Sequence, residues 1–169
     1  MSQQNINLWF NIIFFLLGIF LVYRLPQRLP ITVTILIMTM SLAIALGLDH
    51  TIGAPPIDLY DTNIEPWLTL TEILTWGMYP ISGYLYIYLY DKFNVRGYFI
   101  PLFILCWSTF GTVFEELAKI FKVFVYKDWA SRYSFLVYLF TQLLTTIVFN
   151  FLMKTYRKTV KDKKVFREY

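Results

Sequence analysis

Two adjacent glutamates, Glu115 and Glu116, follow seventeen residues, 98–114, that carry no charge. Lys119 and Lys122 come next at helical spacing. A glutamate followed four residues later by a lysine stabilises a helix by only ~0.3 to 0.5 kcal/mol when the pair is exposed. The glutamates therefore either pair with the lysines where a helix reaches water, or at least one of them turns inward to an acidic pocket.

Asp49, His50 and Glu72 are other ionisable residues at or near the ends of long apolar stretches. Carboxylates that crowd together raise one another's pKa, so a shared proton or a bound cation relieves their repulsion. We therefore predict an acidic pocket for a cation, a proton, a small solute or a cationic lipid head group. The predicted ligand-binding residues are Asp49, His50, Glu72, Glu115 and Glu116.

The elements that position these residues are predicted to be membrane spans. The chain has 169 residues, of which 57% are hydrophobic and 15% charged, and it is too apolar for a soluble domain. Each of five apolar segments approaches the ~20 residues that a helix needs to cross ~30 Å of hydrocarbon. We predict an all-α transmembrane helical bundle in one domain, 1–153, followed by a basic tail, 154–169. The predicted spans are residues 8–23, 31–48, 67–90, 98–118 and 133–153.

Basic residues predict the orientation of the spans, because they are retained on the cytoplasmic side of short loops. The loops after the first and third segments hold two each and the tail holds seven, so eleven of the 15 lysines and arginines share one side. Four others, between 119 and 132, do not fit this pattern. The loop 49–66 has acidic residues and no lysine or arginine. We predict an outer N-terminus and a cytoplasmic tail, with the predicted ligand-binding residues in one outer layer.

Helical phase predicts which sides of the spans face each other, because stripes of polar and small residues let spanning helices approach. Residues 115–127 are predicted to form an amphipathic helix that continues the fourth segment. The alternating tyrosines of 84–90 are interpreted as a helix end in the head-group region. The loop 49–66 is expected to lack regular structure. The predicted inward stripes are Asn7, Asn11 and Gly18; Thr32, Thr39, Ala43 and His50; Thr69, Glu72, Tyr79, Gly83 and Tyr86; and Tyr138, Gln142, Thr145 and Thr146.

Motifs for cofactors and for nucleic acid give no positive signal. The sequence contains no Gly-rich phosphate loop, CxxC pair or HExxH motif, so no cofactor is predicted. The positive charge is concentrated in a short tail beside the predicted bilayer, which argues against nucleic-acid binding. The predicted partners are membrane lipid, a cation, and a second copy of the chain or another membrane protein. The tail either fixes the topology or anchors to anionic lipid.

Short aromatic patterns in the second half of the chain carry a family resemblance. They comprise Met78-Tyr79-Pro80 inside the third segment, a tyrosine-rich end before a basic loop, Phe114-Glu115, and the stretch from Trp129 to Phe135. This combination resembles an uncharacterised family of small multi-span membrane proteins of spore-forming Gram-positive bacteria. The resemblance implies a bacterial plasma membrane or spore membrane and a role in the spore life cycle, without an activity to transfer.

Three classes of function fit these patterns. The favoured one is a non-enzymatic membrane component whose acidic pocket binds its ligand, as a transporter subunit or accessory protein. The second is a scaffold that docks partners through residues 115–127 and the tail. The third is a membrane enzyme acting on lipid or peptide, with Glu72, Glu116 and His50 as acid, base or metal ligands. Intramembrane glutamate proteases are disfavoured, because that family has an arginine where this chain has Ile120.

Overall fold

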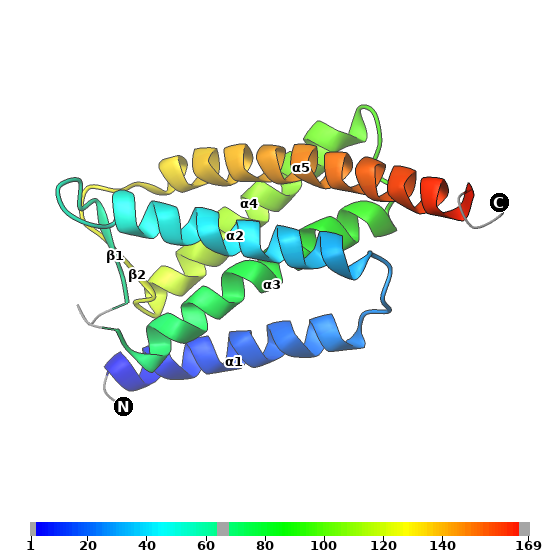
Figure 1. Cartoon of the computed structure of the whole chain (residues 1–169). Helices are drawn as coiled ribbons and strands as arrows, with labels where there is room; N and C mark the ends of the chain where they lie inside the picture. Colours follow the sequence, from blue (N-terminus) through cyan, green and yellow to red (C-terminus); the bar gives the residue numbers. More distant parts are fainter. Residues whose placement is uncertain (1–2, 64–67, 166–169) are drawn as a thin grey trace.

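The computed structural model describes residues 3–63 and 68–165 and is mainly helical, as predicted (Figure 1). The end of the predicted outer loop, including Glu65 and Pro66, and the first residue of the predicted third span, Trp67, lie outside the described residues. Five helices and one two-stranded antiparallel ribbon make up the described part of the chain. The elements are α1 (Gln3–Arg24), α2 (Ile31–Thr51), β1 (Tyr60–Thr62), α3 (Leu70–Lys92), α4 (Phe99–Ile120), β2 (Phe124–Tyr126) and α5 (Ser131–Val165).

Four of the described helices, α1, α2, α4 and α5, are long and apolar enough to cross a membrane. Their outer surfaces carry large apolar side chains that a soluble protein would bury. These side chains include Leu16, Phe20, Ile35, Phe110, Phe140 and Phe151. Lipid is the solvent that suits such a surface, so the protein is a membrane protein.

Helix α3 lies inside the bundle, where it packs against α1 and α2, while α4 packs against α5 (Figure 1). The 23 residues of α3 include the alternating tyrosines of 84–90, which are helical as predicted. Tyr86 is fully buried and its hydroxyl lies 2.5 Å from the Thr146 hydroxyl, while Asn150 Nδ2 donates to the Tyr90 hydroxyl at 3.2 Å. These tyrosines therefore hold α3 against α5 within the bundle, and their level relative to the head groups stays a prediction.

The predicted inward stripes are correct for α1 and α5 and wrong for α2. Asn7, Asn11 and Gly18 are buried, and so are Thr145 and Thr146. In α2 the buried residues are Val33 and Ile37, and the four residues of the predicted stripe are exposed. Lipid explains the error, because apolar side chains suit both sides of a spanning helix and hydropathy alone cannot fix its rotation. The four exposed residues are Thr32, Thr39, Ala43 and His50.

The amphipathic helix predicted over 115–127 is wrong beyond Ile120, where α4 ends. The N–H of Val123 donates to the carbonyl of Ala118 at 3.0 Å, and Lys122 adopts a left-handed conformation with φ 59°. This pattern is a Schellman motif, which closes a helix by satisfying its last carbonyls. The chain then reverses direction and enters β2.

Strand β2 pairs with β1, so the loop 49–66 contains regular structure that the sequence did not predict. The register places Tyr60 opposite Tyr126 and Thr62 opposite Phe124. Helix α5 also differs from the prediction, because it continues to Val165 and makes the first part of the basic tail helical.

Candidate functional site

A cavity of about 150 Å³ lies at the end of the bundle that the ribbon covers. It is lined by side chains of α2, α3, α4 and α5 and by residues of the ribbon and its adjoining loops. Two carboxylates, Asp49 and Glu115, line it from different helices. The other polar lining residues are Ser41, Tyr60, Tyr79, Ser82, Trp129, Ser134, Tyr138, Thr141, Gln142 and Thr145.

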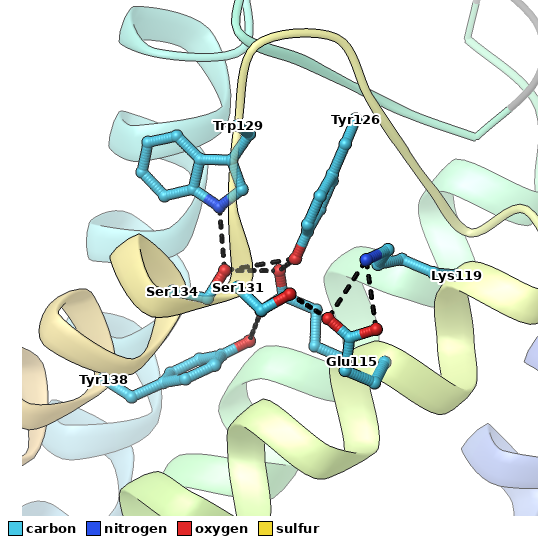
Figure 2. Close-up of polar contacts among 8 residues, drawn as sticks. Glu115, Lys119, Tyr126, Trp129, Ser131, Ser134 and Tyr138 are labelled. Carbon is cyan, nitrogen blue, oxygen red and sulfur yellow. Dashed lines mark hydrogen bonds and ion pairs between the residues drawn. The ribbon is translucent and has the colours of Figure 1, made fainter.

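Glu115 of α4 is buried, with 7% of its surface exposed, and is surrounded by hydroxyl donors. Ser134 donates to Oε1 at 2.7 Å, Tyr138 donates to Oε2 at 2.5 Å, and Tyr126 also donates to Oε1. Trp129 Nε1 donates to Ser134 Oγ at 2.7 Å and so orients that hydroxyl (Figure 2). Every contact presents a donor to the carboxyl group, and this is the arrangement that an ionised carboxylate accepts.

Asp49, near the end of α2, has a similar but smaller set of donors. Tyr60 donates to Oδ1 and Tyr79 donates to Oδ2, each at 2.8 Å. The carboxylates of Asp49 and Glu115 line the same cavity. Each of them is held by one tyrosine from the ribbon and one from a helix.

The ribbon joins the two carboxylates through its register. Tyr60 and Tyr126 are directly opposite one another, and one donates to Asp49 while the other donates to Glu115. Directly opposed residues of an antiparallel pair have Cβ atoms ~4.5 to 5.5 Å apart. Pairing β1 with β2 therefore fixes the distance between two donors that the sequence separates by more than sixty positions, and it brings their acceptors to one end of the cavity.

The structure places the other three predicted residues away from this cavity lining. Glu116 faces outward, where it accepts a bond from Ser131 and pairs with Lys119 Nζ at 3.0 Å. His50 is exposed, and its Nδ1 lies 2.9 Å from its own helix at the Leu46 carbonyl. Glu72 is half-buried in the first turn of α3, where its N–H donates to the Thr69 side chain at 3.3 Å.

Each of the two interpretations of the glutamate pair, an ion pair with lysine and an inward turn to a pocket, therefore applies to one of the glutamates. Glu116 forms the ion pair with Lys119 near the helix end, and Glu115 turns inward to the cavity that Asp49 also lines. Within residues 3–63 and 68–165, no group of three or more His, Cys, Asp and Glu residues could hold a metal ion. The predicted enzyme residues Glu72, Glu116 and His50, which all lie within these ranges, therefore do not form such a group.

Sequence reasoning missed most of the donors that hold the carboxylates. Tyr60, Tyr126 and Trp129 come from short segments between helices, where no periodicity marks an inward side, and Ser134 comes from the first turn of α5. Tyr138 was predicted to face inward from the stripe on α5, and it does so. Tyr60 and Tyr126 each follow the carboxylate that they bind by eleven residues.

Lys127, which directly follows β2, forms ion pairs with Asp61 of β1 and with Asp58 just before that strand. Lys127 Nζ lies 2.7 Å from Asp58 and 2.9 Å from Asp61, and these hydrogen bonds raise the pKa of Lys127. Burial raises the pKa of Tyr60 and of Tyr126, and the adjacent carboxylates raise both further. The ribbon is therefore held in place by groups that all retain their protons more strongly in the fold than in water.

We expect the protein to lose stability as the pH rises above about 10, the ordinary pKa of tyrosine. Above that pH the unfolded chain releases the protons of Tyr60 and Tyr126 while the fold retains them, so the free energy of unfolding falls. Lys127 acts in the same direction, since its contribution is complete below its unfolded pKa and is lost as the pH rises through its raised folded pKa. Thermal unfolding followed across this alkaline range measures the slope.

Tyr60→Phe removes one of these groups and should make the alkaline slope shallower than in the parent protein. The matched control is Tyr23→Phe, because the Tyr23 side chain is 85% exposed at the end of α1. An unchanged slope in Tyr60→Phe would show that ionisation of this residue is not linked to folding.

Comparison of the chain with family models, with curated proteins and with solved structures finds no match. The roles of the residues therefore follow from their contacts and burial in this molecule. The resemblance to membrane proteins of spore-forming bacteria rests on the aromatic sequence patterns, and it stays a prediction.

Proposed function

We propose that this membrane protein binds a small cation in the cavity that Asp49 and Glu115 line. The observation that supports the proposal is the pairing of two carboxylates, from separate helices, in one cavity of about 150 Å³. We also propose that α3 spans the membrane in addition to α1, α2, α4 and α5, which gives five spans. The N-terminus would lie outside and the tail in the cytoplasm. In this orientation the cavity opens toward the outer surface of the membrane.

Charge is the main argument for a cation. The described residues that line the cavity include two acidic side chains and no lysine, arginine or histidine. The tyrosine and serine hydroxyls satisfy carboxylate lone pairs, but they are neutral and add no positive charge to the cavity. A carboxylate at membrane depth costs several kcal/mol unless it is neutralised or has a role. A bound cation removes that cost for both groups.

The atoms around the cavity favour a hard or ammonium-type cation. Carboxylate, hydroxyl and amide oxygens suit alkali and alkaline-earth ions, whereas thiolate and imidazole ligands suit transition metals. The cavity volume is several times the ~30 Å³ that one water occupies in the liquid. A monovalent ion can therefore keep part of its hydration shell there, and an amine head group also fits.

A wider biological role is proposed on the basis of this site. We propose a transporter subunit or accessory protein of a bacterial plasma membrane or spore membrane, and the membrane type rests on the family resemblance. Five spans make a thin wall around a transport path, so a transport role would involve several copies. The scaffold alternative has less support in residues 115–127, since α4 ends at Ile120 and the segment is not one amphipathic helix.

Cation-specific thermal stabilisation tests the proposal directly. We expect sodium, potassium or ammonium to raise the unfolding temperature of the purified protein relative to N-methylglucamine, a cation too bulky for the cavity, at the same ionic strength. A ligand present at 100 times its Kd stabilises the folded state by about 2.7 kcal/mol. Glu115→Gln and Asp49→Asn should each remove most of this difference, because each takes away one charge and keeps the shape of the side chain.

The matched control is Glu116→Gln, which removes the same charge from the neighbouring position outside the cavity. It should keep the cation-specific stabilisation of the parent protein. A parent protein that responds equally to every cation would exclude the site, and an equal loss in all three variants would assign the effect to general surface charge.

A further inference from the structure

A second cavity, of about 600 Å³, lies at the C-terminal end of α3 and shares no lining residue with the cavity of the two carboxylates. It is formed by the last turn of α3, the connection to α4 and the middle of α5. Arg96, Lys154 and Arg157 contribute the basic side chains of its lining, and we name it the basic groove. The remaining lining residues are Tyr90, Asp91, Asn94, Val95, Gly97, Ile100, Phe149, Asn150 and Met153.

The basic groove has an excess of positive charge. Its lining holds three basic side chains and one acidic side chain, Asp91, which gives a net charge of +2. Asp91 already pairs with Arg28 at 3.3 Å. Across the part of the chain that the structure describes, Arg96, Lys154 and Arg157 make no ion pair. All three side chains are exposed and come from two separate segments, so one anion can approach them together.

The depth of the groove matches the boundary of a bilayer. Lys154 comes 23 residues after the first residue of α5, Ser131, which corresponds to ~34 Å along a helix. The hydrocarbon core of a bilayer is ~30 Å thick, so a span that begins near Ser131 reaches the phosphate layer near Lys154. The cations of the groove therefore lie at the level of lipid head groups.

The groove also has an apolar side that a free anion would not need. Val95, Ile100, Phe149 and Met153 line it beside the basic residues. A phospholipid has this combination in one molecule, with a phosphate for the arginines and an acyl chain for the apolar residues. Arginine is well suited to the phosphate, because its planar guanidinium donates two parallel hydrogen bonds.

We propose that the basic groove is a binding site for an anionic phospholipid, with the lipid phosphate held by Arg96, Lys154 and Arg157. This site is separate from the cation cavity and does not depend on it. It differs from a general attraction of the basic tail to the membrane, because it assigns binding to three positions and not to the total charge of the tail.

Lipid binding measured by native mass spectrometry distinguishes the two explanations. The test variant is Lys154→Gln with Arg157→Gln, and the control is Lys158→Gln with Lys161→Gln, which removes the same charge from exposed positions of the same helix outside the groove. We expect phosphatidylglycerol binding to weaken roughly tenfold or more in the test variant. Each basic residue near the membrane surface contributes to the affinity for anionic lipid, and this variant loses two of them. The control should stay within roughly two- to threefold of the parent protein.

Equal weakening in the two double variants would overturn the proposal in favour of general tail charge. Inorganic phosphate and phosphatidylcholine serve as comparison ligands. Tight binding of inorganic phosphate without any preference for phosphatidylglycerol over phosphatidylcholine would assign the groove to a free anion and exclude the lipid.

A second pair of variants covers the case in which the double substitution on α5 prevents folding. Arg96→Gln lies in the connection between α3 and α4 and removes one groove cation, while Lys92→Gln removes a nearby exposed charge outside the groove lining. Arg96→Gln should weaken phosphatidylglycerol binding more than Lys92→Gln does. The same weakening in both would contradict the proposed site.

Discussion

Glu115→Leu is expected to lower the free energy of unfolding by about 2 to 4 kcal/mol. The substitution leaves the hydroxyls of Tyr126, Ser134 and Tyr138 without the acceptor that they share. Each buried donor that loses its partner costs roughly 1 to 3 kcal/mol. Burial of the leucine side chain returns part of that cost, about 1.5 to 3 kcal/mol. The comparison is made in sodium, where the proposed bound cation offsets the cost of the buried carboxylate in the parent protein. Unfolding in mixed micelles measures the net effect.

Glu116→Leu is the control for this prediction, since it changes the adjacent residue in the same way. The Glu116 side chain is 45% exposed, and its pair with Lys119 belongs to a class that contributes about 0 to 1 kcal/mol. We expect a change of no more than about 1 kcal/mol. Similar losses at the two positions would mean that the donors around Glu115 find other partners, and that the carboxylate does not hold the ribbon.

Gly83→Ala is expected to destabilise the contact between α2 and α3 by about 1 to 3 kcal/mol, the usual range for overpacking. A Cβ atom at Gly83 would lie 2.7 Å from Ser41 Cβ and closer still to Ser41 Oγ. Rotation of Ser41 relieves the contact with Oγ but not the contact with Cβ, so the two helices have to move apart. The unfolding temperature and the yield of folded protein measure the effect.

A second substitution should restore the contact if crowding is the cause. Ser41→Gly combined with Gly83→Ala removes both close atoms, Ser41 Oγ and Ser41 Cβ. The double variant then has a Cβ atom on α3 and none on α2 at this contact. The control is Gly47→Ala in α2, where an added Cβ meets nothing within 4 Å. It should be neutral or stabilising by about 0.5 to 1 kcal/mol, because alanine favours a helix. Failure of the double variant to recover would implicate the helix backbone and not the serine.

The helices of this protein were predictable because their length and apolar character are set by the bilayer. The bounds of α2 and α4 lie within three residues of the predicted segments at both ends. Polar residues indicated the inward side correctly in α1, where Asn7 and Asn11 are buried, but incorrectly in α2, where Thr32 and Thr39 are exposed. In α2 the apolar residues on both sides are nearly equivalent, so the rotation depends on α3, and His50 consequently faces outward.

The site was predictable in part for the same reason. The sequence placed Asp49 and Glu115 in one predicted layer, and both line one cavity, but it could not choose between Glu115 and Glu116. That choice depends on the end of α4, which is closed by a lysine in a conformation usually taken by glycine. Strands of three residues are too short to show a period, so the ribbon and its two tyrosines had no sequence signal.

The uninterrupted course of α5 to Val165 decides how far the membrane can act on the charges of the tail. From Lys154 to Val165 the helix advances eleven residues, or ~16 Å along its axis. At physiological ionic strength the Debye length is ~8 Å, so the end of the helix lies about two screening lengths beyond Lys154. Because the helix is rigid, the basic residues near Lys154 interact with the lipid charge, whereas water and salt screen those near the end of the helix from it. Low salt should extend the reach of the membrane field along the helix, and high salt should confine it to the positions next to the groove.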